Sequence, residues 1–213
     1  QTGGDQVFLT SSGTAALEMV ALLCNFQPGE EVILPSFTHI GTANPFLKAG
    51  AQLVWAEIRS DTRNLDERLL ENYLTSRTRA VIIVHYGGIP AAMTEIEAFC
   101  RRHRLILIED AAMALGSYLD GRPAGSWGDM SIISFHHTKN VHCWEGGALI
   151  VNNKRFLKEA GLLYDAGTDR QDFLQGKVEA YTWSKSSSNF KMSEIQAAFL
   201  SPQLEKLEKI TKQ

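Results

Sequence analysis

Lys139 occupies a position where a lysine side chain can act as a nucleophile. Residues 130–135 before it are β-branched and aromatic and predict a buried strand, and residues 146–151 predict another. Lys139 therefore lies on a short polar bend between two core strands, where an ammonium group is costly unless it is paired, neutralised or used covalently. A desolvated lysine of this kind can form a Schiff base. The alternative is an ordinary exposed lysine in a loop.

Two further features could act together with this lysine. Asp110 follows an apolar strand over residues 105–108, and a buried carboxylate there needs a cationic partner. That partner could be Lys139, in a structural ion pair, or a protonated pyridine nitrogen. Residues 11–14 join a strand to an apolar helix and leave backbone N–H groups at the positive end of the helix dipole. This turn suits a phosphate, although an ordinary Ser or Thr N-cap has the same pattern.

One cofactor would use all of these groups. Pyridoxal phosphate requires a lysine for its aldehyde, an acid for its ring nitrogen, a cradle for its phosphate and a flat group over its ring. Lys139, Asp110, the turn at 11–14 and His39 offer these functions in that order. These residues could therefore hold pyridoxal phosphate, which stands beside the structural ion pair as the second explanation of Asp110.

The elements that must position these residues alternate between strands and helices. Strands are expected at 7–10, 31–34, 53–58, 80–84, 105–108, 130–135 and 146–151, and helices at 15–23, 42–49, 67–74, 94–102 and 153–163. This alternation predicts an α/β fold with right-handed crossovers and a largely parallel sheet. Ligands bind beyond the carboxyl ends of such strands. The turn at 11–14, the His85 loop, Asp110 and the bend at 134–139 all follow strands, so we expect one edge of the sheet to gather them.

The chain of 213 residues is expected to form a single domain over residues 1–213, with an irregular excursion over 170–190 and a terminal helix over 192–213. Pro45 is expected near the start of its helix, and Pro202 should kink or interrupt the last one. The net charge of −3 argues against nucleic acid or a membrane as a partner. Cys24, Cys100 and Cys143 show no metal-ligand spacing, so no metal site is expected, and they fit a reducing cytoplasm.

A set of short motifs resembles the DegT/DnrJ/StrS-type sugar aminotransferases, which are pyridoxal phosphate enzymes of fold type I. The motifs follow one another in order along the chain, at residues 12–17, 35–39, 109–112, 134–140, 145–147 and 189–198. Within that family, residues 167–170 and 177–183 most resemble the dTDP-4-amino-4,6-dideoxygalactose transaminases. The resemblance implies an α/β fold in which the chain forms the large domain, while an N-terminal segment and a small C-terminal domain of the relatives are missing.

The resemblance also implies roles for individual residues. Lys139 would hold the cofactor as a Schiff base and move protons, and Asp110 would keep the ring nitrogen protonated. Cofactor contacts would come from Gly13, Thr14, Ala15 and Ser134 around the phosphate, from His39 on the ring face, and from Asn189 of a neighbouring subunit. Met113 stands where the family generally has Gln or His near the phenolic oxygen of the cofactor, and a methionine cannot donate that hydrogen bond.

The implied function is transfer of an amino group from glutamate to a nucleotide-linked 4-keto-6-deoxy sugar, in the biosynthesis of a cell-surface polysaccharide such as O-antigen or enterobacterial antigen. The enzyme would be a cytoplasmic homodimer or a higher homo-oligomer. The short length and Met113 motivate an alternative, a catalytically impaired remnant of this fold that acts as a binding or assembly partner. A Rossmann-type nucleotide binder is disfavoured, because no G-x-G-x-x-G follows the first strand.

Overall fold

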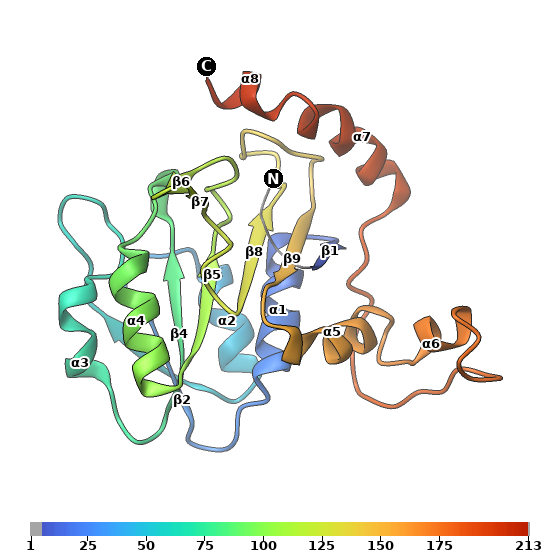
Figure 1. The fold of residues 1–213 in the computed structure, drawn as a ribbon, viewed down its shortest axis with the longest axis horizontal. Coiled ribbons are helices and arrows are strands. Elements are labelled where there is room, and N and C mark those ends of the chain that lie inside the picture. The colour runs from blue at the N-terminus through green and yellow to red at the C-terminus, as the bar shows by residue number, and fades with distance from the viewer. Residues whose placement is uncertain (1–5, 213) are drawn as a thin grey trace.

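Seven strands form one sheet in the computed structural model, which describes residues 6–212 (Figure 1). In spatial order they are β1 (Gln6–Thr10), β9 (Gly147–Val151), β8 (Met130–Ser134), β5 (Ile106–Asp110), β4 (Thr78–Val84), β2 (Glu31–Pro35) and β3 (Gln52–Ala56). A separate small hairpin pairs β6 (Tyr118–Leu119) with β7 (Arg122–Pro123). The expected domain over 1–213 and the expected terminal helix include residues 1–5 and 213, which lie outside the described residues.

The sheet is largely parallel, as the alternation of strands and helices predicts. Strands β3, β2, β4, β5 and β8 pair in parallel, whereas β9 runs antiparallel to both of its neighbours, β8 and β1. The exception has a simple cause, because the bend at 135–146 joins β8 to β9 directly, without the crossover helix that parallel neighbours need. This bend carries Lys139.

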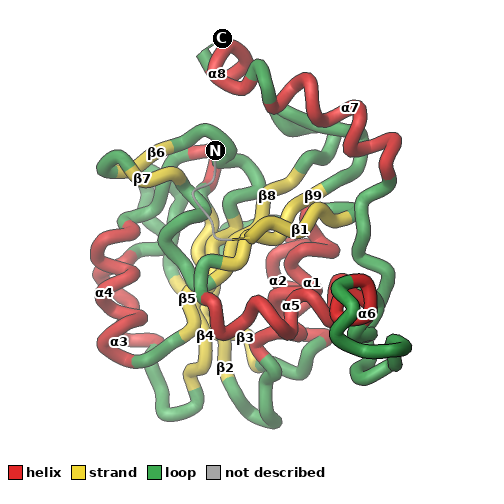
Figure 2. Tube along the Cα trace, turned by 45° about the vertical axis from the view of Figure 1, so that its right-hand side comes forward, coloured by secondary structure: helices red, strands yellow, loops and turns green. Residues whose placement is uncertain are grey.

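Helices cover both faces of the sheet (Figures 1 and 2). One face packs against α1 (Gly13–Cys24), α2 (Ile40–Lys48) and α5 (Leu157–Tyr164), and the other against α3 (Leu70–Tyr73) and α4 (Met93–His103). Residues that alternate along β5 divide between the two cores: Ile106 and Ile108 join the α1 side, and Leu107 joins the α4 side. The same alternation sends Glu109 and Asp110 to opposite faces.

The C-terminal helices differ from the expected single helix. The chain forms α7 (Glu194–Leu204) and α8 (Leu207–Thr211), which lie beyond the end of the sheet in both ribbon views (Figures 1 and 2). Leu200 and Leu207 attach them to a core that includes Ile133 and Ile150. The expected interruption is present, but it follows Leu204, so Pro202 itself lies inside α7.

Three shorter segments refine the expectations further. The expected helix over 42–49 begins earlier, at Ile40, because the His39 side chain caps it by accepting a hydrogen bond from the Gly41 N–H. Pro45, expected near the start of the helix, therefore lies inside it. The excursion over 170–190 contains one short helix, α6 (Arg170–Leu174), and is otherwise irregular. Short 3-10 turns precede or follow longer elements: η1 (Glu67–Leu69), η2 (Tyr86–Gly88) and η3 (Lys154–Phe156).

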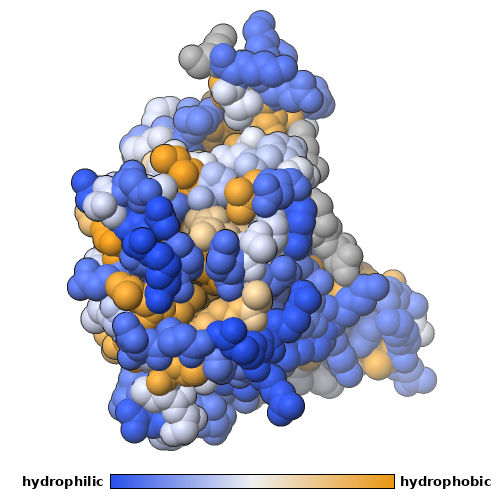
Figure 3. Space-filling model, turned by 60° about the vertical axis from the view of Figure 1, so that its left-hand side comes forward, coloured by the Kyte–Doolittle hydropathy of each residue, from blue (hydrophilic) through white to orange (hydrophobic). Residues whose placement is uncertain are grey.

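The face shown in Figure 3 is largely hydrophilic, with apolar groups in small separated patches. Such scattered apolar groups are ordinary on a protein surface. Among residues 6–212, no helix has the length and the apolar character that crossing a membrane requires.

Candidate active site

A cavity of about 350 Å³ lies where the carboxyl ends of β1, β5 and β8 meet the start of β9. This volume is at the lower end of the range for small-molecule sites, roughly 300–1,000 Å³. Six of the residues expected to bind a cofactor line it: Gly13, Thr14, His39, Asp110, Ser134 and Lys139. They come from positions up to 126 residues apart, counted from Gly13 to Lys139. The parallel strands bring them together because their ends share one edge of the sheet.

The first turn of α1 forms one wall of the cavity. Ser12 caps the helix, since its Oγ accepts a hydrogen bond of 3.0 Å from the Ala15 N–H. Within residues 6–212, the N–H groups of Gly13 and Thr14 have no hydrogen-bond partner, and both residues line the cavity. The ordinary N-cap therefore does not exclude an anion at this turn, because the cap uses only one of the free amides.

Close backbone packing holds this turn against the neighbouring strands. A Cβ atom at Gly147 would lie 2.4 Å from the carbonyl carbon of Ser12, and one at Gly13 would lie 3.0 Å from Ser134 Cβ. Only glycine permits β9 and β8 to approach the start of α1 this closely. The two glycines therefore fix the wall of the cavity.

Asp110 is the buried acid of the site. Its Oδ2 accepts a hydrogen bond of 2.7 Å from Thr42 Oγ1, and its Oδ1 accepts one of 3.1 Å from the Ala112 N–H. Only 5% of the residue is exposed. Burial raises the pKa of the Asp110 carboxyl above its ordinary value, and the bonds from Thr42 and Ala112 and the charge of Lys139 only partly offset this effect.

Lys139 is half-buried on the bend between β8 and β9, held there by a backbone hydrogen bond to His136 O. Within the described residues its ammonium makes no ion pair and no hydrogen bond, so the structural ion pair with Asp110 that the sequence left open does not form. Lys139 also lines a second, smaller pocket of about 90 Å³ together with Met113. The side chain of Lys139 thus stands between the two pockets with its nitrogen free of protein partners.

The remaining expected site residues lie elsewhere. Met113 is 48% exposed and lines only the smaller pocket. The Ala15 N–H is already bonded to Ser12, and Ala15 does not line the cavity. Asn189 is exposed and lines neither pocket; the contact predicted for it is to another copy of the chain and stays a prediction.

The sequence did not single out Thr42, which is 1% exposed and directly bonded to Asp110. It stands 68 residues from its partner, and a threonine in the first turn of a helix has no distinctive sequence signal. Thr42 Oγ1 in turn accepts a hydrogen bond of 2.8 Å from Thr38 Oγ1. The acid is therefore oriented by the start of α2, which also carries His39.

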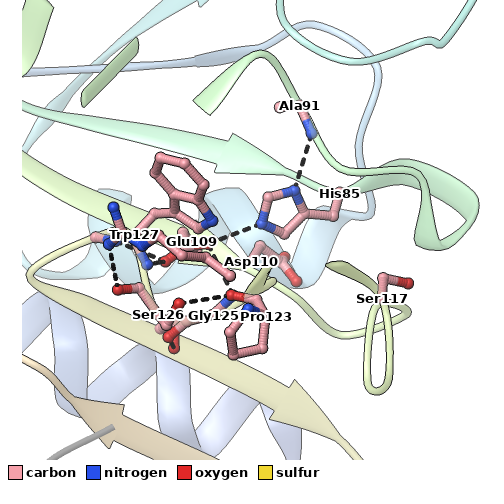
Figure 4. Close-up of polar contacts among 12 residues, drawn as sticks. His85, Ala91, Glu109, Asp110, Ser117, Pro123, Gly125, Ser126 and Trp127 are labelled. Carbon is pink, nitrogen blue, oxygen red and sulfur yellow. Dashed lines mark hydrogen bonds and ion pairs between the residues drawn. The ribbon is translucent and has the colours of Figure 1, made fainter. Parts of the chain in front are cut away.

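The His85 loop joins the site only in part: its Gly87 lines the smaller pocket together with Lys139, but the His85 side chain does not. His85 is fully buried on the opposite face of the sheet, where its Nε2 lies 2.9 Å from Glu109 Oε2 (Figure 4). Its Nδ1 accepts a hydrogen bond from the Ala91 N–H, so Nε2 carries the proton and donates to Glu109. Glu109 also accepts three backbone N–H bonds, from Gly125, Trp127 and Gly128. This network fixes β5 immediately before Asp110.

Known structures with this arrangement identify the class of protein. The seven-stranded, mostly parallel sheet and its flanking helices match the large domain of fold-type-I aminotransferases. More narrowly, the chain matches the model of the DegT/DnrJ/EryC1/StrS aminotransferase family over residues 2–213, and it belongs to that family.

Three solved structures illustrate the similarity. DesI, determined with its TDP-sugar product, is 35% identical, with a TM-score of 0.85 over 98% of this chain and 50% of that chain. Helicobacter pylori PseC, an aminotransferase of pseudoaminic acid biosynthesis, is 28% identical, with a TM-score of 0.87 over 97% and 54%. Spr1654 from Streptococcus pneumoniae in its PLP form is 26% identical, with a TM-score of 0.87 over 98% and 57%. The chain thus spans about half the length of each of these relatives.

Proposed function

We propose that this chain binds pyridoxal phosphate and catalyses amino transfer from glutamate to a nucleotide-linked 4-keto-6-deoxy sugar. The observation that carries the proposal is that one cavity holds both a buried, doubly hydrogen-bonded Asp110 and a lysine nitrogen that has no partner among residues 6–212. Lys139 and Asp110 are the proposed catalytic residues. Pyridoxal phosphate, when bound, supplies an electron sink next to the substrate carbon.

The cavity offers a complementary group for each part of this cofactor. The free N–H groups of Gly13 and Thr14 at the start of α1 suit a phosphate, and Ser134 adds a hydroxyl beside them. Lys139 Nζ is the proposed nucleophile for the aldehyde, because no carboxylate among residues 6–212 forms an ion pair with it. His39 has a flat ring that is fixed by the Gly41 N–H, and Ala15, Met113 and Asn189 remain proposed cofactor contacts.

Asp110 would act on the ring nitrogen through its charge. Without the cofactor, burial favours the protonated form of Asp110, because the charge of Lys139 offsets this effect only in part. A protonated pyridine nitrogen at the carboxyl would favour the carboxylate, and the bonds from Thr42 and Ala112 would hold both oxygens in place. Lys139, which lines the same cavity, would then take and return the proton at the reacting carbon.

The substrate and the assembly belong to the same proposal. Support for a nucleotide sugar comes from the family and from DesI, whose structure contains a TDP-sugar product. A homodimer would allow Asn189 to reach the cofactor of the other copy, and the irregular segment over 170–190 would lie near that contact. We place the enzyme in the cytoplasm, in the biosynthesis of a cell-surface polysaccharide.

Reduction of the protein–cofactor bond tests this proposal directly. The 213-residue chain would be mixed with pyridoxal phosphate, reduced with borohydride, digested and mapped by mass spectrometry. We expect one adduct on Lys139 and its loss in Lys139→Ala. Lys48→Ala is the matched control, because Lys48 is exposed and pairs only with Glu18 on the surface.

The result has clear alternatives. An adduct on a different lysine would remove Lys139 from the proposed role. No adduct in the wild-type chain would favour the non-catalytic alternative. Amino transfer from glutamate, followed with a TDP-linked 4-keto-6-deoxy sugar, then tests the substrate separately from the cofactor.

A further inference from the structure

Three side chains with metal-binding atoms meet on the bend that carries Lys139. His136 and His137 follow β8, and Glu145 precedes β9. One ligand atom from each lies within 4.8 Å of the other two, and no other trio of His, Cys, Asp or Glu in residues 6–212 does this. The closest pair, His136 Nε2 and Glu145 Oε1, is 3.3 Å apart. The two imidazole rings lie side by side, with 4.0 Å between their centroids.

These positions fit a small divalent transition-metal ion. Zinc binds His nitrogen and carboxylate oxygen at about 2.0–2.2 Å, which places two ligands of a tetrahedral ion about 3.3–3.5 Å apart. The separation between His136 Nε2 and Glu145 Oε1 matches one edge of such a tetrahedron. Two imidazoles and one carboxylate are a recurrent ligand set for zinc, with water in the fourth position.

The surrounding contacts order the ligands. A backbone hydrogen bond of 2.8 Å from His137 N to Trp144 O joins the two sides of the bend. His136 Nδ1 accepts a hydrogen bond of 3.4 Å from the Thr138 N–H and lies 2.9 Å from Thr138 Oγ1, so the ring is held through Nδ1. Its Nε2 faces Glu145 and can bind a metal with release of the proton that it carries in this tautomer. His137 and Glu145 are exposed, so an ion can enter from solvent.

We propose that His136, His137 and Glu145 bind one divalent transition-metal ion, with Zn²⁺ as the best match, at the rim of the cavity. His136 and Glu145 also line that cavity. The metal therefore binds at its entrance, next to Lys139. This inference does not depend on the proposed aminotransferase activity, because all three ligands belong to the chain itself.

Calorimetric titration with Zn²⁺ tests the site on the 213-residue chain, freed of any affinity tag and of cofactor. His137→Ala removes one exposed ligand, and His103→Ala is the matched control. His103 Nε2 also lies 3.3 Å from a glutamate, Glu71, but within residues 6–212 that pair has no third ligand. We expect the wild type to bind one Zn²⁺ per chain and His137→Ala to bind it at least about tenfold more weakly. Replacing residues that only hydrogen-bond to a metal ligand already weakens binding by about this factor, so loss of a ligand should cost no less. His103→Ala should bind like the wild type.

Cobalt substitution identifies the ligand atoms. We expect weak visible bands from nitrogen and oxygen ligands, without thiolate charge-transfer absorption. No stoichiometric binding, equal affinities of the His137 and His103 variants, or a thiolate band would each overturn the proposal. If His137→Ala does not fold, as judged by its circular dichroism, His137→Gln serves as the second variant, and unchanged binding by it would also overturn the site.

Discussion

Replacing Glu109 with glutamine should destabilise the protein far more than its conservative chemistry suggests. Glu109 is fully buried and accepts four hydrogen bonds, two on each oxygen. Oε1 receives the N–H groups of Trp127 and Gly128, whereas Oε2 receives those of Gly125 and His85. Glutamine keeps one acceptor oxygen but places an NH₂ group where the other oxygen was.

The size of the effect follows from the donors left without an acceptor. If the glutamine oxygen keeps the bonds from Trp127 and Gly128, its NH₂ group faces the N–H groups of Gly125 and His85. His85 cannot become an acceptor at Nε2 by moving its proton to Nδ1, because Nδ1 accepts the Ala91 N–H. Each buried donor without a partner costs about 1–3 kcal/mol, so two cost about 2–6 kcal/mol. This is a large part of the roughly 5–15 kcal/mol by which natural domains are stable.

Urea unfolding followed by circular dichroism measures this loss by linear extrapolation. Glu97→Gln is the control, because Glu97 makes only surface ion pairs with Arg101 and Arg122, which contribute about 0–1 kcal/mol. We expect Glu109→Gln to lower the free energy of unfolding well beyond the control, with a similar denaturant slope. Equal losses in the two variants would refute the reasoning, because the buried network would then contribute nothing net.

Two other substitutions test the cavity itself. Because the raised pKa of Asp110 makes its ionisation unfavourable in the cofactor-free fold, stability falls as the pH rises through that pKa, so Asp110→Asn should be more stable than wild type near neutral pH. The stability advantage of Asp110→Asn over the wild type should shrink as the pH falls towards about 4, the ordinary pKa of an aspartate. A difference in the free energy of urea unfolding that stays constant over this pH range would contradict the prediction. Gly147→Ala should lower the melting temperature, because its Cβ would lie 2.4 Å from the Ser12 carbonyl carbon. Gly161→Ala is the control: Gly161 lies in α5 with open space around it, so alanine should stabilise the protein by up to about 1 kcal/mol. Equal melting temperatures for these two variants would show that the turn is not tightly packed.

Much of the framework was predictable because it depends on local patterns. Apolar runs such as 80–84 and 130–134 are long enough to be strands covered on both faces, and their alternation with helices implies a parallel sheet. The rule that ligands bind beyond strand ends then placed Asp110, Ser134 and Lys139 near one another. The resemblance to a family added the individual roles, which stay proposals.

Errors arose where local rules compete with packing. The loop after β4 was expected to reach the site, and its Gly87 does line the smaller pocket beside Lys139. The His85 side chain lies instead on the opposite face of the sheet, where it donates a hydrogen bond to the buried Glu109. Pro202 is tolerated inside α7, and the break after Leu204 allows Leu200 and Leu207 to pack against one core. Helix boundaries of this kind are set by tertiary contacts rather than by propensity.

The sequence by itself determined the α/β class, the order of the elements and the side chains able to do chemistry, because these depend on periodicity and residue type. Only the tertiary structure decided which of those side chains meet. It bonds Thr42 to Asp110 across 68 positions and leaves the Lys139 nitrogen without a partner in the described part of the chain. It also gathers His136, His137 and Glu145 into one cluster. Such contacts depend on how the strand ends and the bend between β8 and β9 pack in space, which the order of residues along the chain does not encode locally.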